Sequence, residues 1–357
     1  MTSQPVRLLS VGTAVPPDSY TQAELLDEFQ IADSRIRSLF LNSAIDRRNL
    51  VLPPVGPDGG RRMETQGELL RKHTISGLEM GEAAIRSCLA RTGAELDDVA
   101  YLCCVSSTGF ITPGFSAKLI ARLGLAPTCS RLDVIGMGCN AGLNALNSVV
   151  GWARMNPGRL ALMACIEVCS AAYVFDGTMR TAVVNGLFGD GAAAVALSQP
   201  APGDPAVDRE VGPSVLKFSS LIIPDAIDAM RYDWDEDQGR FSFFLHPDVP
   251  YEVGAHAGPA LERLLAGTGL HRSDVKHWLV HSGGKKVIDA VRVDLGLSRY
   301  DVRHTTSVLR EHGNLSSGSF LFSYDRLLGE GLAEHGDHGV MMTMGPGSTI
   351  EMALLQW

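Results

Sequence analysis

The sequence contains an internal repeat, which constrains the fold more than any other feature. Blocks of the first half recur in the same order in the second half, and four of the five pairs lie roughly 175 residues apart, as duplicated units do. The pairs are Thr92-Gly93 with Thr268-Gly269, Asp98-Val99 with Asp274-Val275, Leu123-Gly124-Leu125 with Leu295-Gly296-Leu297, GCNAGLNAL (138–146) with GNLSSGSFL (313–321), and GDGAAAVAL (189–197) with GPGSTIEMAL (345–354). One such match arises easily by chance, but an ordered series favours duplication of one structural unit.

Each unit has the pattern of alternating strands and helices. Short apolar runs without polar alternation are typical of strands that are covered on both faces. Such runs occupy residues 99–105, 132–135, 160–166, 192–197 and 275–280. Apolar residues between them recur at helical spacing, for example Phe115, Leu119 and Leu123. We therefore predict an α/β fold with two halves, 1–198 and 214–357, related by a pseudo-twofold axis and joined by a Pro-rich linker at 199–213.

Cys139 lies in the stretch GMGCNAG (136–142), which has two competing functional interpretations. The spacing fits the G-x-G-x-x-A turn of a dinucleotide site, and Glu167 ends the next strand, where a ribose-binding acid would stand. Alternatively, the glycines present Cys139 at a helix N-terminus, where the helix dipole favours a thiolate. The repeat partner GNLSSG lacks phosphate-binding glycines, which favours the nucleophilic cysteine. An inert buried thiol is the third interpretation.

Two residues of the second half are candidate partners for Cys139. His281 ends the apolar run 275–280 and precedes Ser282-Gly283-Gly284, so its ring is expected at the end of a strand, where α/β proteins hold their sites. It can take the cysteine proton. Asn314 stands opposite Cys139 in the repeat and can donate its amide to an oxyanion. Taken alone, His281 is equally typical of a histidine buried in a protein core. Asn314, taken alone, is equally typical of a helix N-cap.

Composition excludes several other functions. A net charge of −9 argues against a general nucleic-acid binder. The seven cysteines contain no C-x-x-C pair, so we expect neither a disulfide framework nor a zinc site, and no other metal constellation is evident. No segment approaches the ~18 apolar residues of a membrane span and the start does not resemble a signal peptide, so a cytoplasmic protein without membrane association is expected.

The duplicated halves, the cysteine that opens a helix, the histidine before Gly-Gly and the segment GNLSS (313–317) together resemble the thiolase fold. Within it the chain is similar to the type III, chalcone-synthase-like polyketide synthases, from SVGTAVPP (10–17) to MGPGSTIEMALL (344–355). A thiolase would have a second cysteine in the C-terminal segment, which is missing here. The resemblance implies an α/β fold with two pseudo-twofold-related halves in a layered α-β-α-β-α architecture.

The same resemblance implies a mechanism and partners. Malonyl-CoA would load onto Cys139, with His281 and Asn314 polarising the thioester carbonyl and stabilising the enolate that decarboxylation leaves. Malonyl-CoA would supply both starter and extender units for a resorcinol-type CoA thioester used in antibiotic biosynthesis. No cofactor is implied beyond the coenzyme A thioester substrates. A homodimer is implied, as is a small crotonase-like partner protein that assists aromatisation. A catalytically silent acyl-CoA-binding scaffold is the alternative from another class.

Further site residues follow from the resemblance alone. Phe188 and Phe243 match gatekeeper phenylalanines, and Gly345, Pro346 and Gly347 match the loop that shapes the cavity floor. The positions that match cavity-lining residues are Ser107, Thr108, Thr112, Val174 and Ser316. Arg35 matches a basic residue at the mouth of the coenzyme A tunnel, but Ser38 and Asn42 replace two others, so Arg37, Arg47 or Arg48 are candidate substitutes.

Overall fold

The computed structural model describes residues 4–57, 59–173, 176–201 and 212–357. Nine strands of this part of the chain form one sheet in the order β11-β12-β13-β8-β1-β7-β6-β4-β5. The strands are β1 (Arg7–Ala14), β4 (Val99–Ser106), β5 (Ser130–Ile135), β6 (Leu160–Glu167), β7 (Gly191–Ser198), β8 (Ser214–Ile222), β11 (Val275–Val280), β12 (His338–Gly345) and β13 (Thr349–Gln356). All five strands that the apolar runs predict are present.

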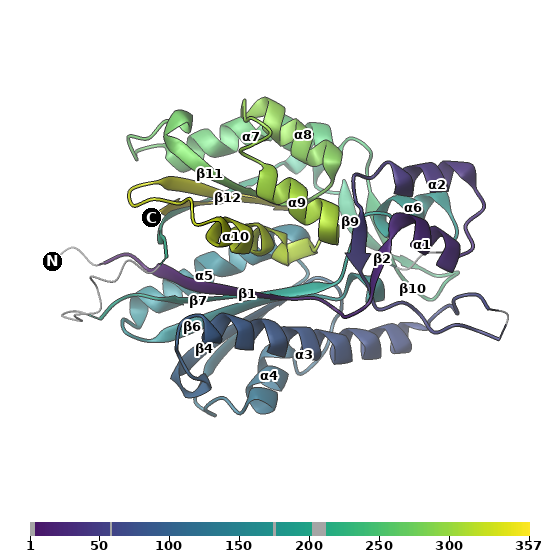
Figure 1. The fold of residues 1–357 in the computed structure, drawn as a ribbon, viewed down its shortest axis with the longest axis horizontal. Helices are drawn as coiled ribbons and strands as arrows, with labels where there is room; N and C mark the ends of the chain where they lie inside the picture. The colour runs from purple at the N-terminus through teal and green to yellow at the C-terminus, as the bar shows by residue number, and fades with distance from the viewer. Residues whose placement is uncertain (1–3, 58, 174–175, 202–211) are drawn as a thin grey trace.

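The sheet consists of two parts that lie in separate layers (Figure 1). Between β1 and β8 the only ladder partners in the described chain are Arg7 and Ser214, so a single point joins the N-terminal strands to the C-terminal ones. Helices α5 (Ala141–Met155) and α10 (Ser319–Glu330) lie between the two parts and contact strands of both. This arrangement confirms the predicted layered α/β fold.

Other helices cover the two outer faces (Figure 1). On one side these are α3 (Gln66–Ala90) and α4 (Phe115–Leu123), and on the other α7 (Val249–Leu265) and α8 (Lys285–Asp294). A further helix, α9 (Arg303–His312), contacts β11, α8 and α10. One end of the molecule carries a group of short elements: β2 (Ser19–Thr21), α1 (Gln22–Glu28), α2 (Ser34–Leu41), β3 (Arg47–Asn49), α6 (Met179–Asn185), β9 (Met230–Asp235) and β10 (Arg240–Leu245).

The two halves repeat one topology. Strand order β4-β6-β7-β1 in the first corresponds to β11-β12-β13-β8 in the second. The ladders also shift register at equivalent places, between Val99 and Tyr101 in β4 and between Val275 and His277 in β11. We propose that the halves meet in the segment 199–213, most of which lies outside the described residues.

The central helices α5 and α10 approach each other closely because Gly142 has no side chain. A Cβ on Gly142 would lie 2.3 Å from the carbonyl oxygen of Ser317 and 2.6 Å from the ring of Phe320. Such distances are far inside van der Waals contact, so a larger residue would force the helices apart. Gly142 therefore allows the two halves to approach closely at the point where their central helices begin.

The structure corrects the repeat register around Cys139. Each central helix follows a 3₁₀ turn, Gly138–Asn140 in the first half and Ser316–Gly318 in the second. The first residue of each turn has a positive φ, 76° at Gly138 and 48° at Ser316. Cys139 therefore corresponds to Ser317, not to Asn314. Matching glycine to glycine misled the sequence comparison, because a serine holds the left-handed position in the second half.

Candidate active site

Cys139 lies where the two halves meet. It is 7% exposed in the turn Gly138–Asn140, which contacts the equivalent turn Ser316–Gly318. Its sulfur lies 3.5 Å from the Ser316 hydroxyl oxygen. The strands and helices of both halves thus position this one thiol.

Asn314 is fixed beside Cys139 by a short bridge to the segment around Phe188. The Asn314 N–H donates to the Leu187 carbonyl at 2.9 Å, and the Gly189 N–H donates to the Asn314 carbonyl at 3.0 Å. Its side-chain oxygen accepts the Ser316 N–H at 2.8 Å. Because the oxygen is used within the turn, the NH₂ group is the part of the amide that can donate to a ligand.

His281 follows β11 and is 2% exposed. The backbone N–H of His281 donates to the Met342 carbonyl on β12 at 2.8 Å. The Ser282 hydroxyl donates to the Gly313 carbonyl at 3.4 Å. The second bond connects the residue after His281 to the residue before Asn314. Nδ1 of His281 is buried and has no hydrogen-bond partner within the described residues, so the ring retains polar capacity for a ligand.

Burial keeps both reactive groups neutral when the site holds no substrate. It raises the pKa of the Cys139 thiol to about 12, against the opposing effect of hydrogen bonds from Ser316 and Asn314. It lowers the pKa of His281 to about 3. Desolvation thus outweighs the helix N-terminus that the sequence suggests would favour a thiolate. Transfer of the thiol proton to the imidazole would create two opposite charges, each of which stabilises the other.

A buried carboxylate lies behind the thiol, and sequence reasoning placed it in the site only under the rejected dinucleotide interpretation. Glu167, at the end of β6, accepts hydrogen bonds from the Ser107 N–H at 3.0 Å, from the Ser107 hydroxyl at 3.0 Å and from the Ser317 hydroxyl. Ser107 also lies 2.8 Å from Ser316, which contacts Cys139. A chain of hydroxyls therefore connects this carboxylate to the sulfur. The only sequence feature that points to Glu167 is its position at the end of an apolar strand.

Burial raises the pKa of Glu167 to about 7, so its ionisation opposes folding. Stability from the neutral form is present in full below about pH 4.5 and is lost as pH rises toward 7, since the folded pKa lies above the unfolded one. At about 1.4 kcal/mol per pKa unit, the loss is a few kcal/mol. The free energy of unfolding of the wild type and of Glu167→Gln can be measured in urea from pH 4.5 to 8.5. We expect the wild-type value minus the variant value to fall as pH rises and to become constant above pH 7. A constant difference would contradict the assignment.

The loop Gly345 to Gly347 packs directly on the cysteine turn. A Cβ on Gly345 would lie 2.5 Å from the Asn140 side-chain oxygen and 3.0 Å from the Cys139 nitrogen. A Cβ on Gly138 would lie 2.4 Å from the ring of Pro346. Protein therefore covers the turn at the place where a pyrophosphate would need to bind. The dinucleotide interpretation is wrong.

The remaining residues carried over from the resemblance have mixed positions. Phe188 and Phe243 are buried in the same hydrophobic cluster as Cys139. Thr108 is buried, but its hydroxyl lies 3.3 Å from His73 Nδ1 and accepts the Val168 N–H, so it is committed to the protein interior. Thr112 is exposed on the loop before α4 and does not reach the cavity of its own chain. Val174 lies outside the described residues.

The basic residues are also divided between surface and interior. The Arg35 side chain is 77% exposed at the start of α2, 3.5 Å from Asp33. Arg47 is exposed as well, and Arg37 is partly exposed beside Asp27. Arg48 is 1% exposed. The hypothesis that Arg48 contacts coenzyme A phosphates is wrong, because the folded chain surrounds its guanidinium.

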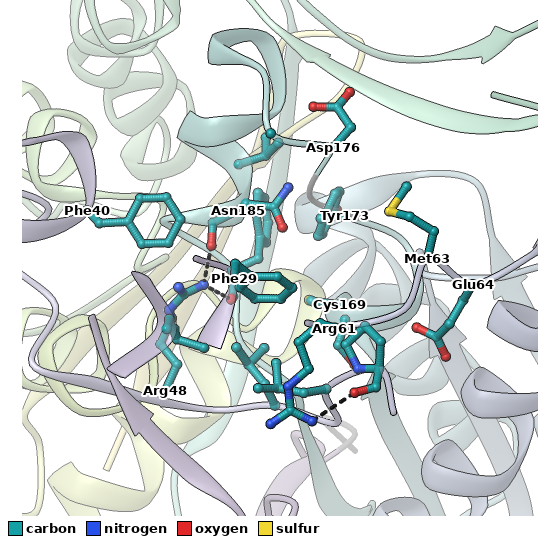
Figure 2. Close-up of a pocket in the computed structure, with 18 of the residues that line it drawn as sticks. Phe29, Phe40, Arg48, Arg61, Met63, Glu64, Cys169, Tyr173, Asp176 and Asn185 are labelled. Atoms are coloured by element: carbon teal, nitrogen blue, oxygen red, sulfur yellow. Dashed lines mark hydrogen bonds between the residues drawn. The ribbon is translucent and has the colours of Figure 1, made fainter. Parts of the chain in front are cut away.

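Arg48 instead holds the segment from Asn185 to Phe188. Its guanidinium donates to the carbonyls of Asn185 at 2.7 Å and Phe188 at 2.6 Å, and Figure 2 shows it reaching toward Asn185. It forms one wall of a cavity of about 220 Å³. Cys169, Tyr173 and Phe188 line the side of this cavity that adjoins the Cys139 cluster.

No group of three His, Cys, Asp or Glu side chains in the described ranges is arranged to hold a metal ion.

Comparison with known proteins decides the family. The sequence model of the chalcone and stilbene synthases, N-terminal domain, matches residues 53–200, and that of the C-terminal domain matches residues 218–357. The chain belongs to the chalcone and stilbene synthase family. As a type III polyketide synthase it is an acyltransferase that acts on coenzyme A thioesters. None of its described helices is both long and apolar enough to cross a bilayer.

Individual members of the chalcone and stilbene synthase family match over almost the whole chain. It is 64% identical over 351 residues to the 3,5-dihydroxyphenylacetyl-CoA synthase of Streptomyces toyocaensis, covering 98% of this chain and 90% of that protein. The crystal structure of 1,3,6,8-tetrahydroxynaphthalene synthase from Streptomyces coelicolor superposes with a TM-score of 0.87 at 28% identity, covering 98% and 99%. A synthase structure from the brown alga Ectocarpus siliculosus, at 23% identity, shares the fold with a TM-score of 0.91, covering 100% and 99%.

Proposed function

We propose that this chain condenses malonyl-CoA units and cyclises them to 3,5-dihydroxyphenylacetyl-CoA. The observation that carries this proposal is the 64% identity to the Streptomyces toyocaensis synthase of that name over 98% of the chain. A naphthalene product is less well supported, since the tetrahydroxynaphthalene synthase with a known structure is only 28% identical. The meeting of Cys139, Asn314 and the His281 segment agrees with an active enzyme and not with a silent scaffold.

We assign the catalytic roles from the positions of the three side chains. Cys139 attacks the thioester, coenzyme A leaves, and the acyl chain stays on the sulfur. Asn314 donates its NH₂ group, and His281 a ring N–H, to the oxygen that becomes negative in each step. When malonyl-CoA loses carbon dioxide, the electron pair of the broken bond passes into an enolate. Asn314 and His281 stabilise this enolate through hydrogen bonds to its oxygen. The enolate carbon then bonds to the acyl carbon, and the Cys139 sulfur leaves.

The carbon balance sets the number of condensations. An eight-carbon acyl group needs four two-carbon units, so four malonyl-CoA molecules release four carbon dioxide and three coenzyme A, with one coenzyme A retained. Ring formation then removes one water. A crotonase-like partner is proposed to assist that dehydration. No external oxidant or reductant is required by this balance.

Substrate contacts and assembly are proposed at a coarser level. Phe188 and Phe243, which are buried in one cluster with Cys139, are proposed to gate it, with Ser107 and Ser316 lining the cavity. Arg35 is proposed to meet the phosphates of coenzyme A, since its side chain is exposed. The Thr112 loop carries Phe110, which is 71% exposed, and this supports a homodimer that covers it.

Incubation with malonyl-CoA as sole substrate tests the function. We expect a resorcinol-type product by mass spectrometry and an acyl adduct on the peptide that contains Cys139. A naphthalene skeleton would keep the family and reject the product assignment. Absence of both adduct and product in the presence of a homologous crotonase-like protein would reject the function.

A further inference from the structure

Four aromatic rings pack together in and against the hydrophobic cluster that contains Cys139, and two of them carry hydroxyl groups. Tyr173 stacks on Phe188 with ring centroids 4.0 Å apart and meets Phe243 edge-on at 5.3 Å. Tyr232, on β9, lies 5.0 Å from Phe243 and 6.0 Å from Tyr173. Tyr173, Phe188 and Phe243 are buried in one hydrophobic cluster with Cys139, and Tyr232 packs against it. Most of this wall is apolar, so its two phenols are the exceptions.

The Tyr232 hydroxyl is buried and is not satisfied by the protein. Its oxygen has no partner with full hydrogen-bond geometry among the residues that the structure describes, although the Tyr173 phenol lies near enough to donate weakly to it, which leaves the Tyr232 O–H itself free to donate. Burial raises the pKa of both tyrosines well above the usual value of 10, so both are donors at neutral pH. A buried hydroxyl without a partner destabilises the free protein, and an acceptor supplied by a ligand would remove that cost.

A growing polyketide chain supplies such acceptors. Each condensation adds a carbonyl group, so a chain tethered to Cys139 carries several oxygen atoms into an otherwise apolar space. Ring closure requires that one of these carbonyl carbons, and not another, be attacked by the terminal carbon of the same chain. A hydrogen bond to one oxygen makes its carbon the more electrophilic and fixes the fold of the chain.

We propose that the Tyr232 hydroxyl, positioned by Tyr173, donates a hydrogen bond to a carbonyl oxygen of the tethered polyketide and thereby selects the carbonyl that is attacked in ring closure. In this step the terminal carbon of the chain, which lies next to a carbonyl group, loses a proton and bonds to the carbonyl carbon that is attacked. The carbonyl π electrons pass to its oxygen, which gains a proton, so atoms and charge balance before water is lost. The proposal rests on the function proposed above and adds a specificity-determining residue to it.

Tyr232→Phe tests the proposal because it removes one oxygen atom and keeps the ring. We expect carbon dioxide release from malonyl-CoA to change less than about threefold. The ratio of resorcinol product to lactone and other shunt products should fall about fivefold to tenfold, the factor that one neutral hydrogen bond is worth. Tyr173→Phe should shift the ratio in the same direction by a smaller factor.

Tyr324→Phe is the matched control, because the Tyr324 hydroxyl is also buried without a described partner but lies in a different hydrophobic cluster. It should leave the product ratio unchanged. Thermal melting checks that all three variants fold, and removal of the Tyr232 hydroxyl should not lower the melting temperature. An unchanged product ratio in folded Tyr232→Phe would overturn this inference, whereas failure of the wild type to acylate Cys139 would overturn the proposed function instead.

Discussion

We expect Cys139→Ala to abolish product formation from malonyl-CoA, by about 10⁴-fold or more, which is the scale on which removal of a nucleophile acts. The variant deletes the only atom that can carry the acyl chain in the proposed mechanism. It should fold, because the sulfur makes one long side-chain contact within the described residues, 3.5 Å to the Ser316 hydroxyl oxygen. Intact-protein mass spectrometry and product analysis measure the effect.

Cys169→Ala is the matched control for this loss. Cys169 is a second buried thiol of the same cluster, 1% exposed, so its removal creates a similar small cavity next to the site. The control should keep both the adduct and the product. Slow release of carbon dioxide by Cys139→Ala is also expected, since Asn314 and His281 can still stabilise an enolate. Product at the wild-type rate in Cys139→Ala would show that the mechanism is wrong.

The second large effect is expected at Asn314. Loss of one donor to a developing oxyanion lowers turnover by about 10²- to 10³-fold. Asn314→Ala removes the donor and also the acceptor of the Ser316 N–H, whereas Asn314→Asp keeps the acceptor and replaces only the NH₂ group. Both variants should therefore lose turnover to a similar extent, measured as kcat for carbon dioxide release.

Comparison of these two Asn314 variants separates catalysis from structure. If Asn314 merely caps its turn, the aspartate variant should keep wild-type turnover and only the alanine variant should fall. Thermal melting gives the independent measure, since only alanine should lower the melting temperature. Turnover that follows stability across both variants would return Asn314 to a structural role.

The sequence predicted the scaffold well because its signals are local. Runs such as 160–166 are strands since they are apolar without alternation, and β6 occupies Leu160–Glu167. The thiol at the start of a helix was also predicted, because a strand, a glycine turn and an apolar helical pattern stand in order around Cys139. These inferences need only neighbouring residues.

The errors concern burial and pairing over long distances. Arg48 has an ordinary basic sequence context, and only the carbonyls of Asn185 and Phe188, more than 130 positions away, make it an interior residue. Glu167 is connected to Cys139 through Ser107 and Ser316, and Tyr232 packs against the cysteine cluster, and no spacing rule predicts either contact. The Asn314 register failed because Ser316 adopts a backbone conformation that is usually reserved for glycine.

The place of β1 in the sheet has a consequence for synthesis of the chain. Val11 pairs with Val195, which is made 184 positions later, and Arg7 pairs with Ser214. At about 5–20 residues per second, the first strand leaves the ribosome roughly 10 to 40 s before its partner exists. The apolar segment RLLSVGTA must stay unpaired for that time, and closing so long a loop slows folding. Folding of the first half is therefore completed from its last strand, and chaperones that shield extended apolar segments should raise the yield of this enzyme.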